Sequence, residues 1–264
     1  MTAYDDAPMQ SGSSHHPREV LRGAGAGGLS GWCARRRGGS DLNVRSGPQR
    51  CEYEAIVERI ARDRPRRILD WGCGFGLMTM LLRERGLDVV AYDYRSDAPG
   101  ERVAPLEHFP EIHAHISSDP VRLPFPASSF HAVLSSGVLE HVADPDASLD
   151  ELRRVLAPGG VLYVYKLPNR YSYLERLAKG LGMYYHGAEP GDAVYTRRSA
   201  TRLLRAHGFE VGHCRRANML PLTLEGRLAQ RLAGPIWAAN RALSRVPGLN
   251  MLATNLEVVA TAPR

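Results

Sequence analysis

The hydrophobic positions of this chain form two patterns, helical spacing and short continuous runs, and the two patterns alternate along most of its length. Helical spacing appears in RCEYEAIVERIARD, from Arg50 to Asp63, and it is followed by short apolar runs such as ILDW and VVAYDY. Apolar positions three or four residues apart predict one buried helix face, whereas a short continuous apolar run predicts a buried strand. Strands that alternate with helices indicate a parallel sheet covered by helices on both faces.

The predicted elements follow one another in a regular order. Helices are expected over 50–63, 77–86, 145–160 and 196–209, and strands over 67–71, 87–94, 111–119, 130–137, 161–168, 209–216 and 254–262. Pro65 is expected to end the first helix, and Gly86 and Gly208 to end the second and the fourth. The third helix is expected to stop at the Gly159–Gly160 pair.

Two segments fall outside this alternation. Residues 1–48 are rich in glycine, serine and arginine and poor in large apolar residues, so we expect a disordered tail, followed by one domain over 49–264. Residues 220–248 carry an apolar stripe at helical spacing, which Gly234 and Pro235 are expected to divide into two helices. The stripe consists of Leu224, Leu228, Leu232, Ile236, Ala239 and Leu243.

Composition narrows the range of partners and compartments. The chain has 264 residues and a net charge of +6, yet Lys166 and Lys179 are its only lysines among 34 basic residues, and this arginine bias does not favour a nucleic-acid-binding surface. The four cysteines show neither C-x-x-C nor cysteine–histidine ligand spacing, so no disulfide framework and no metal site are predicted. Without a secretory pattern or an apolar run of ~18 residues, a cytoplasmic location is expected.

The segment RRILDWGCGFGLMTMLL places Gly72, Gly74 and Gly76 directly after a predicted strand. A dinucleotide fingerprint would need a glycine where Leu77 stands, and the G-K-[ST] of a P-loop is absent. Asp70, at the end of the strand, would repel a pyrophosphate but attract an ammonium group. The loop is therefore expected to approach a small cationic molecule closely.

A second acid marks the end of the next predicted strand. Asp93, in VVAYDY, stands where a carboxylate can accept hydrogen bonds from both hydroxyls of a ribose. An ammonium group and a ribose occur together in S-adenosylmethionine (SAM). The two acids and the glycine loop thus indicate SAM as the cofactor.

Four segments between about residues 51 and 169 carry a wider pattern. They are ILDWGCGFG, VVAYDY, SSDPVRLPFPASSFHAVLSSGVLEHVADP and LRRVLAPGGVLYVYKLPN. In order and spacing they resemble the class I SAM-dependent methyltransferases, within the broad small-molecule group. The resemblance implies a SAM-dependent enzyme with a three-layer α/β/α fold, Rossmann-like and doubly wound, whose mostly parallel sheet has an antiparallel last strand.

The resemblance also implies a role for each matching residue. Asp70 would orient the methionine ammonium, and Asp93 would bind the ribose. At the adenine, Tyr94 would lie beside the ring, Asp119 would accept a hydrogen bond from the amino group, and Pro120 or Val121 would flank the ring. For Tyr94 and Asp119, plain packing or capping is an alternative. The full implied set is Asp70, Gly72, Cys73, Gly74, Gly76, Asp93, Tyr94, Asp119 and Pro120, with Ser135 and Ser136 lining the sulfonium region.

Two histidines are candidates for the base that removes a proton from the methyl acceptor. The motif VLEHV holds Glu140 and His141 near the reacting methyl group, and His186 lies in the segment expected to cover the acceptor. An imidazole titrates near neutral pH and therefore suits general-base catalysis. For His141, packing or contact with the cofactor through the backbone is an equal alternative.

Segments after the shared motifs are expected to build the acceptor site. A lid is predicted over about 168–196, because seven of the eleven tyrosines fall between Tyr163 and Tyr195 and offer aromatic faces to a sugar, quinone or phenol. The stripe in 220–248 is expected either to pack on the sheet or to make peripheral contact with a membrane or a lipid acceptor.

These features predict methyl transfer from SAM to a small or lipid-linked acceptor, foremost O-methylation of a carbohydrate or glycolipid. The alternatives are C- or N-methylation of a quinone, polyketide or other small metabolite, and a non-catalytic protein that keeps the fold for binding. A nucleobase acceptor is disfavoured, because SSGVLE stands where an N-P-P-[YF] motif would be expected.

Overall fold

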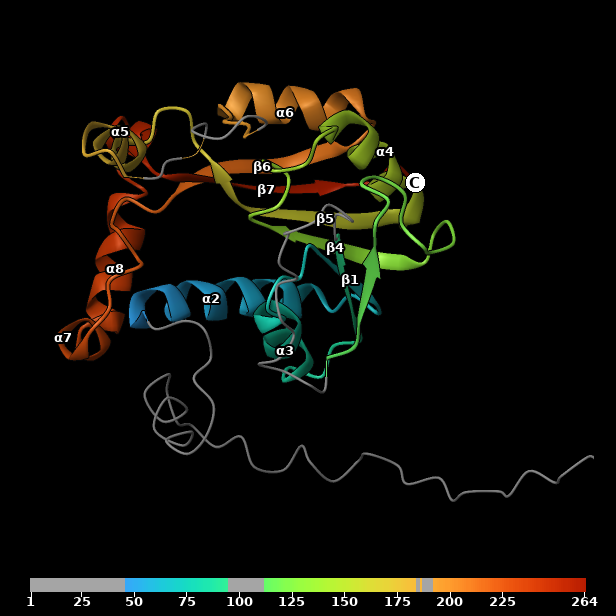
Figure 1. Ribbon diagram of the computed structural model, residues 1–264, viewed down its shortest axis with the longest axis horizontal. Coiled ribbons are helices and arrows are strands. Elements are labelled where there is room, and N and C mark those ends of the chain that lie inside the picture. Colours follow the sequence, from blue (N-terminus) through green and yellow to red (C-terminus); the bar gives the residue numbers. More distant parts are fainter. Residues whose placement is uncertain (1–45, 95–111, 184–185, 187–191) are drawn as a thin grey trace, which may run out of the picture. The chain divides into compact units, whose positions relative to one another are not determined.

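The computed structural model of the protein describes residues 46–94, 112–183, 186 and 192–264 (Figure 1). The predicted tail falls outside the described residues up to residue 45. Ser46 to Pro48, which the sequence analysis assigns to that tail, are buried at the start of the first described helix. All described residues belong to one compact unit, Asp41–Arg264.

Seven strands form one sheet, in the order β3-β2-β1-β4-β5-β7-β6. The strands are β1 (Ile68–Trp71), β2 (Val89–Tyr94), β3 (Ala114–Ser117), β4 (Phe130–Ser136), β5 (Leu156–Pro168), β6 (Glu210–Ala217) and β7 (Asn255–Thr261). The pairs from β3 to β5 are parallel, and β7 runs antiparallel to both of its neighbours, β5 and β6. The predicted fold, with a mostly parallel sheet and an antiparallel last strand, is confirmed.

Helices cover both faces of this sheet. They are α2 (Gly47–Asp63), α3 (Leu77–Arg83), α4 (Pro145–Val155), α5 (Tyr173–Gly180), α6 (Arg197–Ala206), α7 (Arg227–Arg231) and α8 (Ala233–Leu243), with a 3-10 turn at Leu249–Leu252. Figure 1 shows α4 and α6 on one face and α2 and α3 on the other, while α5, α7 and α8 gather at one end of the sheet. Three layers result, as expected for a doubly wound sheet.

Local signals in the sequence account for most helix ends. Ser46 caps α2 by accepting a hydrogen bond from the amide of Gln49, and Asp144 caps α4 in the same way through the amide of Ala147. At the other end of α2, Arg64 has a φ of 48°, so the chain turns out of the helix just before Pro65. Capping side chains and proline thus mark these boundaries in the local sequence, and the hydroxyl of Ser46 also donates to the carbonyl of Leu222.

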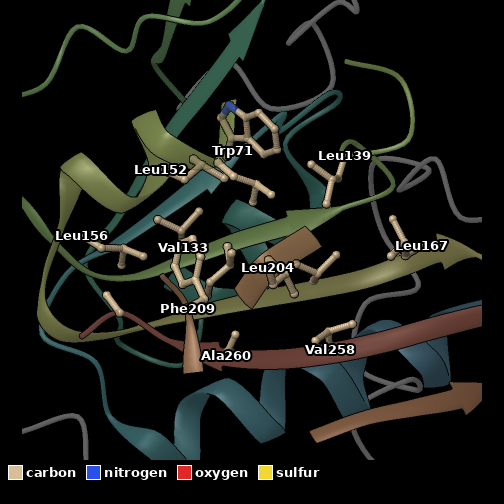
Figure 2. Packing of buried hydrophobic residues seen from close by; sticks show 14 of the residues in the cluster. Trp71, Val133, Leu139, Leu152, Leu156, Leu167, Leu204, Phe209, Val258 and Ala260 are labelled. Atoms are coloured by element: carbon tan, nitrogen blue, oxygen red, sulfur yellow. The ribbon is translucent and has the colours of Figure 1, made fainter. Parts of the chain in front are cut away.

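The hydrophobic core lies between the sheet and the layer formed by α4 and α6. Leu152 of α4 and Leu204 of α6 pack against Val133 of β4 and Val258 of β7 (Figure 2). The central strands are buried over nearly all of their lengths, which explains why they read as continuous apolar runs rather than as alternating patterns. This rigid sheet holds the loops at its carboxyl edge in place.

The predicted end of the third helix is wrong. The third helix was expected to continue to Gly159–Gly160, but α4 ends at Val155, and Leu156 already has extended backbone angles. Both glycines lie inside β5, whose register shifts opposite Phe130 and Ala132. A Cβ at Gly160 would come 2.8 Å from the carbonyl oxygen of Ala157, so the glycine serves an irregularity within the strand rather than a helix stop.

The segment 220–248 forms two helices, as predicted, and they meet at Leu232. Pro235 lies in the first turn of α8, where the amide that proline lacks would have no partner within the helix. No residue of the predicted stripe is buried: Leu224, Leu228, Leu232 and Ala239 are exposed, and Ile236 and Leu243 are half-buried. Among the described residues, no helix is both long and apolar enough to cross a membrane.

Candidate active site

The carboxyl ends of β1 and β4 lie side by side at the centre of the sheet. Trp71 at the end of β1 is level with Ser135 of β4, and the chain order reverses between these two strands. In doubly wound sheets ligands bind at such a switch point, outside the carboxyl ends of the strands. The glycine loop leaves β1 at this place and leads into α3.

Three left-handed glycines shape the loop. Gly72, Gly74 and Gly76 have φ angles of 74°, 51° and 81°, a region that other residues enter only with strain. The amides of Gly72 and Cys73 both donate to the carbonyl oxygen of Tyr92 at 2.9 Å, which ties the loop to β2. The predicted tight backbone approach therefore has a defined geometry.

The two sides of the loop differ in the space around them. A Cβ at Gly72 would lie 2.4 Å from Cγ2 of Val138, so this glycine lets the loop after β4 pack directly on the loop after β1. A Cβ at Gly74 would meet no atom of the described residues within 4 Å. Gly74 thus leaves open space beside the backbone, as a closely held ligand requires.

Asp70 is buried below the loop. Its Oδ2 atom accepts a hydrogen bond of 2.6 Å from the hydroxyl of Thr79 on α3. Burial raises the pKa of this carboxyl to about 6; the bond from Thr79 opposes the rise and the nearby Asp93 adds to it. An ammonium group nearby would restore the ionised form, so the site suits a cationic ligand.

Asp93 connects the end of β2 to the loop. Its Oδ2 accepts from the amide of Gly74 at 2.6 Å and its Oδ1 from the amide of Tyr94 at 2.8 Å. Burial raises the pKa of Asp93, and these two amide bonds oppose the rise. A carboxylate offers about four acceptor positions, so it can still receive two ribose hydroxyls. The bond to Gly74 is a positioning contact that the sequence analysis did not anticipate.

The residues expected around the adenine are exposed. Tyr94 is 47% exposed, and Pro120 also lies at the surface. Asp119 accepts from the amides of Val121 and Arg122 at 2.9 and 2.7 Å, and these bonds lower its pKa. In this structure Asp119 therefore caps the turn that follows it, as one of the two alternatives predicted. Its hydrogen bond to the adenine stays a prediction.

The residues expected around the sulfonium lie at the end of β4. Ser135 is buried, and its hydroxyl has no hydrogen-bond partner among the described residues. Ser136 is half-buried next to it. A buried polar atom without a partner calls for a ligand or a water molecule. Together with the open space at Gly74 and the buried Asp70, it fits SAM.

A cluster of titratable groups follows directly after β4. Potential ligand atoms of Glu140, His141 and His186 all lie within 4.8 Å of one another, so the fold brings the two predicted base candidates together. Nδ1 of His141 is 2.9 Å from Oδ1 of Asp192, and Nδ1 of His186 is 2.8 Å from Oε1 of Glu175. The bond to Glu175 raises the pKa of His186, and burial raises that of Glu140.

This cluster was only partly foreseen. The motif VLEHV drew attention to Glu140 and His141, but nothing in the sequence pattern indicated Asp192 or Glu175. His141 and Asp192 are 51 residues apart, and only the fold makes them neighbours. The set of one carboxylate and two imidazoles could hold a metal ion, although cysteine and histidine spacing predicted no metal site.

A groove of about 520 Å³ lies next to the cluster, between α5 and the chain after β6. It is lined by apolar side chains of α5 and the turn after it, and by the segment 220–223. The residues that line it include Leu174, Leu177, Ala178, Leu181 and Met183, together with Glu175, Lys166 and Glu52. Glu175 therefore borders the groove and also bonds to His186.

Lys166 is one of the polar residues that line this groove. Its Nζ donates to the hydroxyl of Tyr53 at 2.8 Å, lies 4.0 Å from the centre of that ring, and is 3.4 Å from Oε2 of Glu52. Burial alone would lower the pKa of Lys166, but Glu52 and Tyr53 outweigh it and the net shift is upward. The groove is thus lined by an ion pair, Lys166 and Glu52, as well as by apolar side chains.

Comparison with protein families matches residues 47–213 to the family described as "Methyltransferase domain". A demethylmenaquinone methyltransferase of Thermus thermophilus is 36% identical over 124 residues, covering 42% of this chain and 52% of the relative. A ubiquinone biosynthesis O-methyltransferase of Cereibacter sphaeroides is 30% identical over 160 residues, covering 53% and 58%. The matched region spans little more than half of these relatives.

Solved structures share the fold at low identity. A SAM-dependent methyltransferase of Thermotoga maritima, described as a possible histamine N-methyltransferase, has a TM-score of 0.52 at 18% identity and covers 82% of this chain and 91% of its own. The 1,6-didemethyltoxoflavin-N1-methyltransferase of Burkholderia thailandensis, solved with bound S-adenosylhomocysteine, has a TM-score of 0.52 at 19% identity, covering 84% and 80%.

The strand order, the left-handed glycine loop between two strand-end acids and the family match lead to the same assignment. The match covers more than half of the chain and includes every element from α2 into β6. This chain belongs to the methyltransferase domain family, within the class I SAM-dependent methyltransferases.

Proposed function

We propose that the protein transfers the methyl group of SAM to an oxygen atom of a lipid-linked acceptor. The groove carries this proposal, because its wall of leucines and methionine on and after α5 adjoins the cluster that follows β4. An apolar wall with a few polar groups at one end is typical of sites for ligands with an apolar body and a polar reacting group.

The cofactor side of the site has separate tasks for separate residues. SAM supplies a methyl group on a positively charged sulfur, which makes that carbon an electrophile. Asp70 is placed to attract the ammonium group, Asp93 to bind the ribose, and Ser135 and Ser136 to line the space beside the sulfonium. Methyl transfer then depends chiefly on aligning the acceptor and excluding water.

The acceptor side offers an apolar channel and a proton acceptor. Glu175 lines the groove and bonds to His186, and the ring centres of His186 and His141 are 5.9 Å apart. Either imidazole is therefore a candidate to take the proton of an acceptor hydroxyl. Lys166 also lines the groove, and its ammonium group, which is paired with Glu52, is suited to a hydroxyl group of the acceptor.

Two classes of polar head group are compatible with this proposal. The sequence pattern favours a carbohydrate or glycolipid. The names of the relatives favour a quinol instead, since they refer to menaquinone and ubiquinone and not to a carbohydrate. Both classes share a hydroxyl on a lipid, and the experiment therefore uses both.

The test begins with SAM binding by calorimetry and continues with transfer of a labelled methyl group. We expect transfer to long-chain glycolipids or quinols dispersed in detergent, and weaker transfer to the same head groups with short chains. Mass spectrometry of the product identifies the methylated atom. Failure to bind SAM at millimolar concentration would overturn the enzyme assignment, and methylation at carbon or nitrogen would overturn the O-methyl assignment.

A pair of leucine variants tests the groove directly. Leu181 lines the groove and is 64% exposed, whereas Leu228 is 69% exposed on α7 and is not among the groove residues. Leu181→Asp is expected to raise the KM for a long-chain acceptor by about tenfold or more, because it places a charge against the chain. Leu228→Asp should leave this KM nearly unchanged. Equal effects of both variants would argue against the groove as the acceptor site.

A further inference from the structure

Three titratable side chains, from the segments after β4 and α5, lie close together. The proposed function gives a role to only two of them, the histidines. Glu140 and His141 follow β4, and His186 follows α5. One potential ligand atom from each lies within 4.8 Å of the other two. One carboxylate and two imidazoles form a set that commonly binds divalent transition-metal ions.

The buried carboxylate gives a second and independent observation. Glu140 is 2% exposed, and its Oε2 atom has no hydrogen-bond partner among the described residues. Burying a carboxylate oxygen without a partner is costly, and a coordinated cation removes that cost. The backbone carbonyl of Glu140 accepts from the amide of Ala193, which holds this residue between β4 and the lid segment.

The two histidines are oriented in the same manner. His141 faces Asp192 through Nδ1, and His186 faces Glu175 through Nδ1. A neutral imidazole that donates from Nδ1 to a carboxylate carries its lone pair on Nε2. Metal-binding histidines nearly always have such a carboxylate or carbonyl partner, which fixes the tautomer and the ring orientation.

We propose that Glu140, His141 and His186 bind a divalent transition-metal ion, of the class of Zn²⁺. Two imidazoles favour Zn²⁺ over Mg²⁺, which prefers oxygen ligands and retains water. Three protein ligands leave at least one coordination position for another molecule, as in catalytic zinc sites.

The location of the three residues indicates what fills the open position. Val138, two residues before Glu140, packs on Gly72 of the cofactor loop, and Glu175 borders the acceptor groove. The ion would therefore stand between the SAM site and the groove. Its role toward the acceptor rests on the proposed function: it takes an acceptor oxygen and directs it toward the methyl group.

Methyl transfer to the coordinated oxygen needs no reactant other than SAM and the acceptor. A hydroxyl that coordinates a divalent ion is acidic enough to release its proton to water near neutral pH. The oxygen forms the new bond to the methyl carbon, and the bond between that carbon and the sulfur breaks, which yields the methyl ether and S-adenosylhomocysteine. In this arrangement His141 and His186 act as ligands rather than as bases.

Metal binding is tested on the full chain without SAM or acceptor. After treatment with EDTA and dialysis, the protein is titrated with Zn²⁺ by calorimetry and with Co²⁺ by visible absorption. We expect one tight site per chain. The visible absorption bands of bound Co²⁺ should be typical of a low coordination number with nitrogen and oxygen ligands. Glu140→Gln and His186→Ala should each weaken binding by about tenfold or more, and Asp192→Asn by a similar factor, because Asp192 orients a ligand.

His207 provides the matched control. Its imidazole lies between Asp146 and Asp150 at 2.8 and 2.9 Å, so it is also a histidine with carboxylate partners, but it packs α6 against α4 away from the cluster. His207→Ala should leave metal affinity unchanged. Equal loss in this variant, or full affinity in Glu140→Gln, would overturn the proposed site.

Two further readouts separate this proposal from the proposed function. Circular dichroism and SAM binding should remain near wild type in Glu140→Gln, which shows that a lost metal site is not lost folding. If the chain binds the ion at the cluster but shows equal KM and kcat with and without it, the site stands and its role toward the acceptor is wrong. If SAM does not bind, the metal titration still decides the site.

Discussion

The carboxylate of Asp93, at the end of β2, accepts a 2.6 Å hydrogen bond from the amide of Gly74 in the loop after β1. The residue expected to bind the ribose therefore also holds the loop that approaches the methionine. Loss of this side chain should affect the shape of the site as well as its contacts with SAM. Substitutions at Asp93 can separate the two effects.

Asp93→Ala is expected to weaken SAM binding by about 1 to 3 kcal/mol, since it removes the acceptor for the ribose hydroxyls and the bond to Gly74. Asp93→Asn keeps one oxygen acceptor and should lose less. Calorimetric titration with SAM measures both. Asp88→Ala is the control, because Asp88 is 63% exposed and pairs with Arg67 before β2. A dissociation constant unchanged in Asp93→Ala would refute the ribose assignment.

Asp70 should make the stability of the SAM-free protein depend on pH. Its pKa is raised from 3.8 to about 6 in the folded protein. The folded state therefore binds more protons than the unfolded state between these values, and this contribution to stability falls as the pH rises from about 4 to about 6. The shift corresponds to up to about 3 kcal/mol. Asp70→Asn should raise the Tm near pH 8 and change it little near pH 4.

The affinity for SAM should increase as the pH rises, whereas the stability of the SAM-free protein decreases. An ammonium group favours the ionised form of Asp70, so binding should weaken as the pH falls through about 6. Thr79→Val removes the hydroxyl that donates to this carboxylate, and it should shift the midpoint of the pH profile upward. The same profile in Asp70→Asn as in the wild type would show that another group is responsible.

Gly72 and Gly74 should respond differently to alanine. Both have positive φ, so each substitution costs about 1 to 2 kcal/mol of backbone strain. At Gly72 the new methyl group would also meet Val138, whereas at Gly74 it would enter open space. Urea unfolding should therefore show the greater loss for Gly72→Ala, and Val138→Ala in the same chain should recover part of it.

In Gly74→Ala the main loss should instead be in SAM binding. The added methyl group would occupy the space beside the loop that we assign to the ligand. Calorimetry at constant temperature would measure the change. Normal SAM affinity together with a large loss of stability in this variant would contradict the assignment of that space.

The buried pair of Lys166 and Glu52 is expected to be coupled. Lys166→Met leaves the Glu52 carboxylate buried beside the neutral donor Asn218, and loss of one partner of such a pair costs about 3 to 5 kcal/mol. Adding Glu52→Gln should recover much of this loss. Lys179, the other lysine, is exposed on α5, and Lys179→Met should change the free energy of unfolding by less than about 0.5 kcal/mol. Additive effects of the two changes in the pair would exclude the coupling.

Much of this fold follows from local sequence alone. The spacing of apolar residues predicted where the helices and strands lie, because each kind of element buries its apolar residues in a characteristic pattern. Pro65 and the capping residues Ser46 and Asp144 set helix ends through bonds to near neighbours. The order of strands and helices, the glycine loop and the acids at the ends of β1 and β2 were therefore readable, and the family resemblance rested on these same segments.

The tertiary structure decided the features that depend on residues far apart in the sequence. The pairing of Leu156 with Phe130 extends β5 into the predicted helix, although the local pattern favours helix there. The contact of His141 with Asp192 and the pairing of Lys166 with Glu52 join different elements. No period or spacing encodes such contacts, because they arise only when the sheet brings its loops to one edge. The sequence by itself determined the family and the cofactor loop, whereas the groove and the Glu140–His141–His186 cluster exist only in the folded chain.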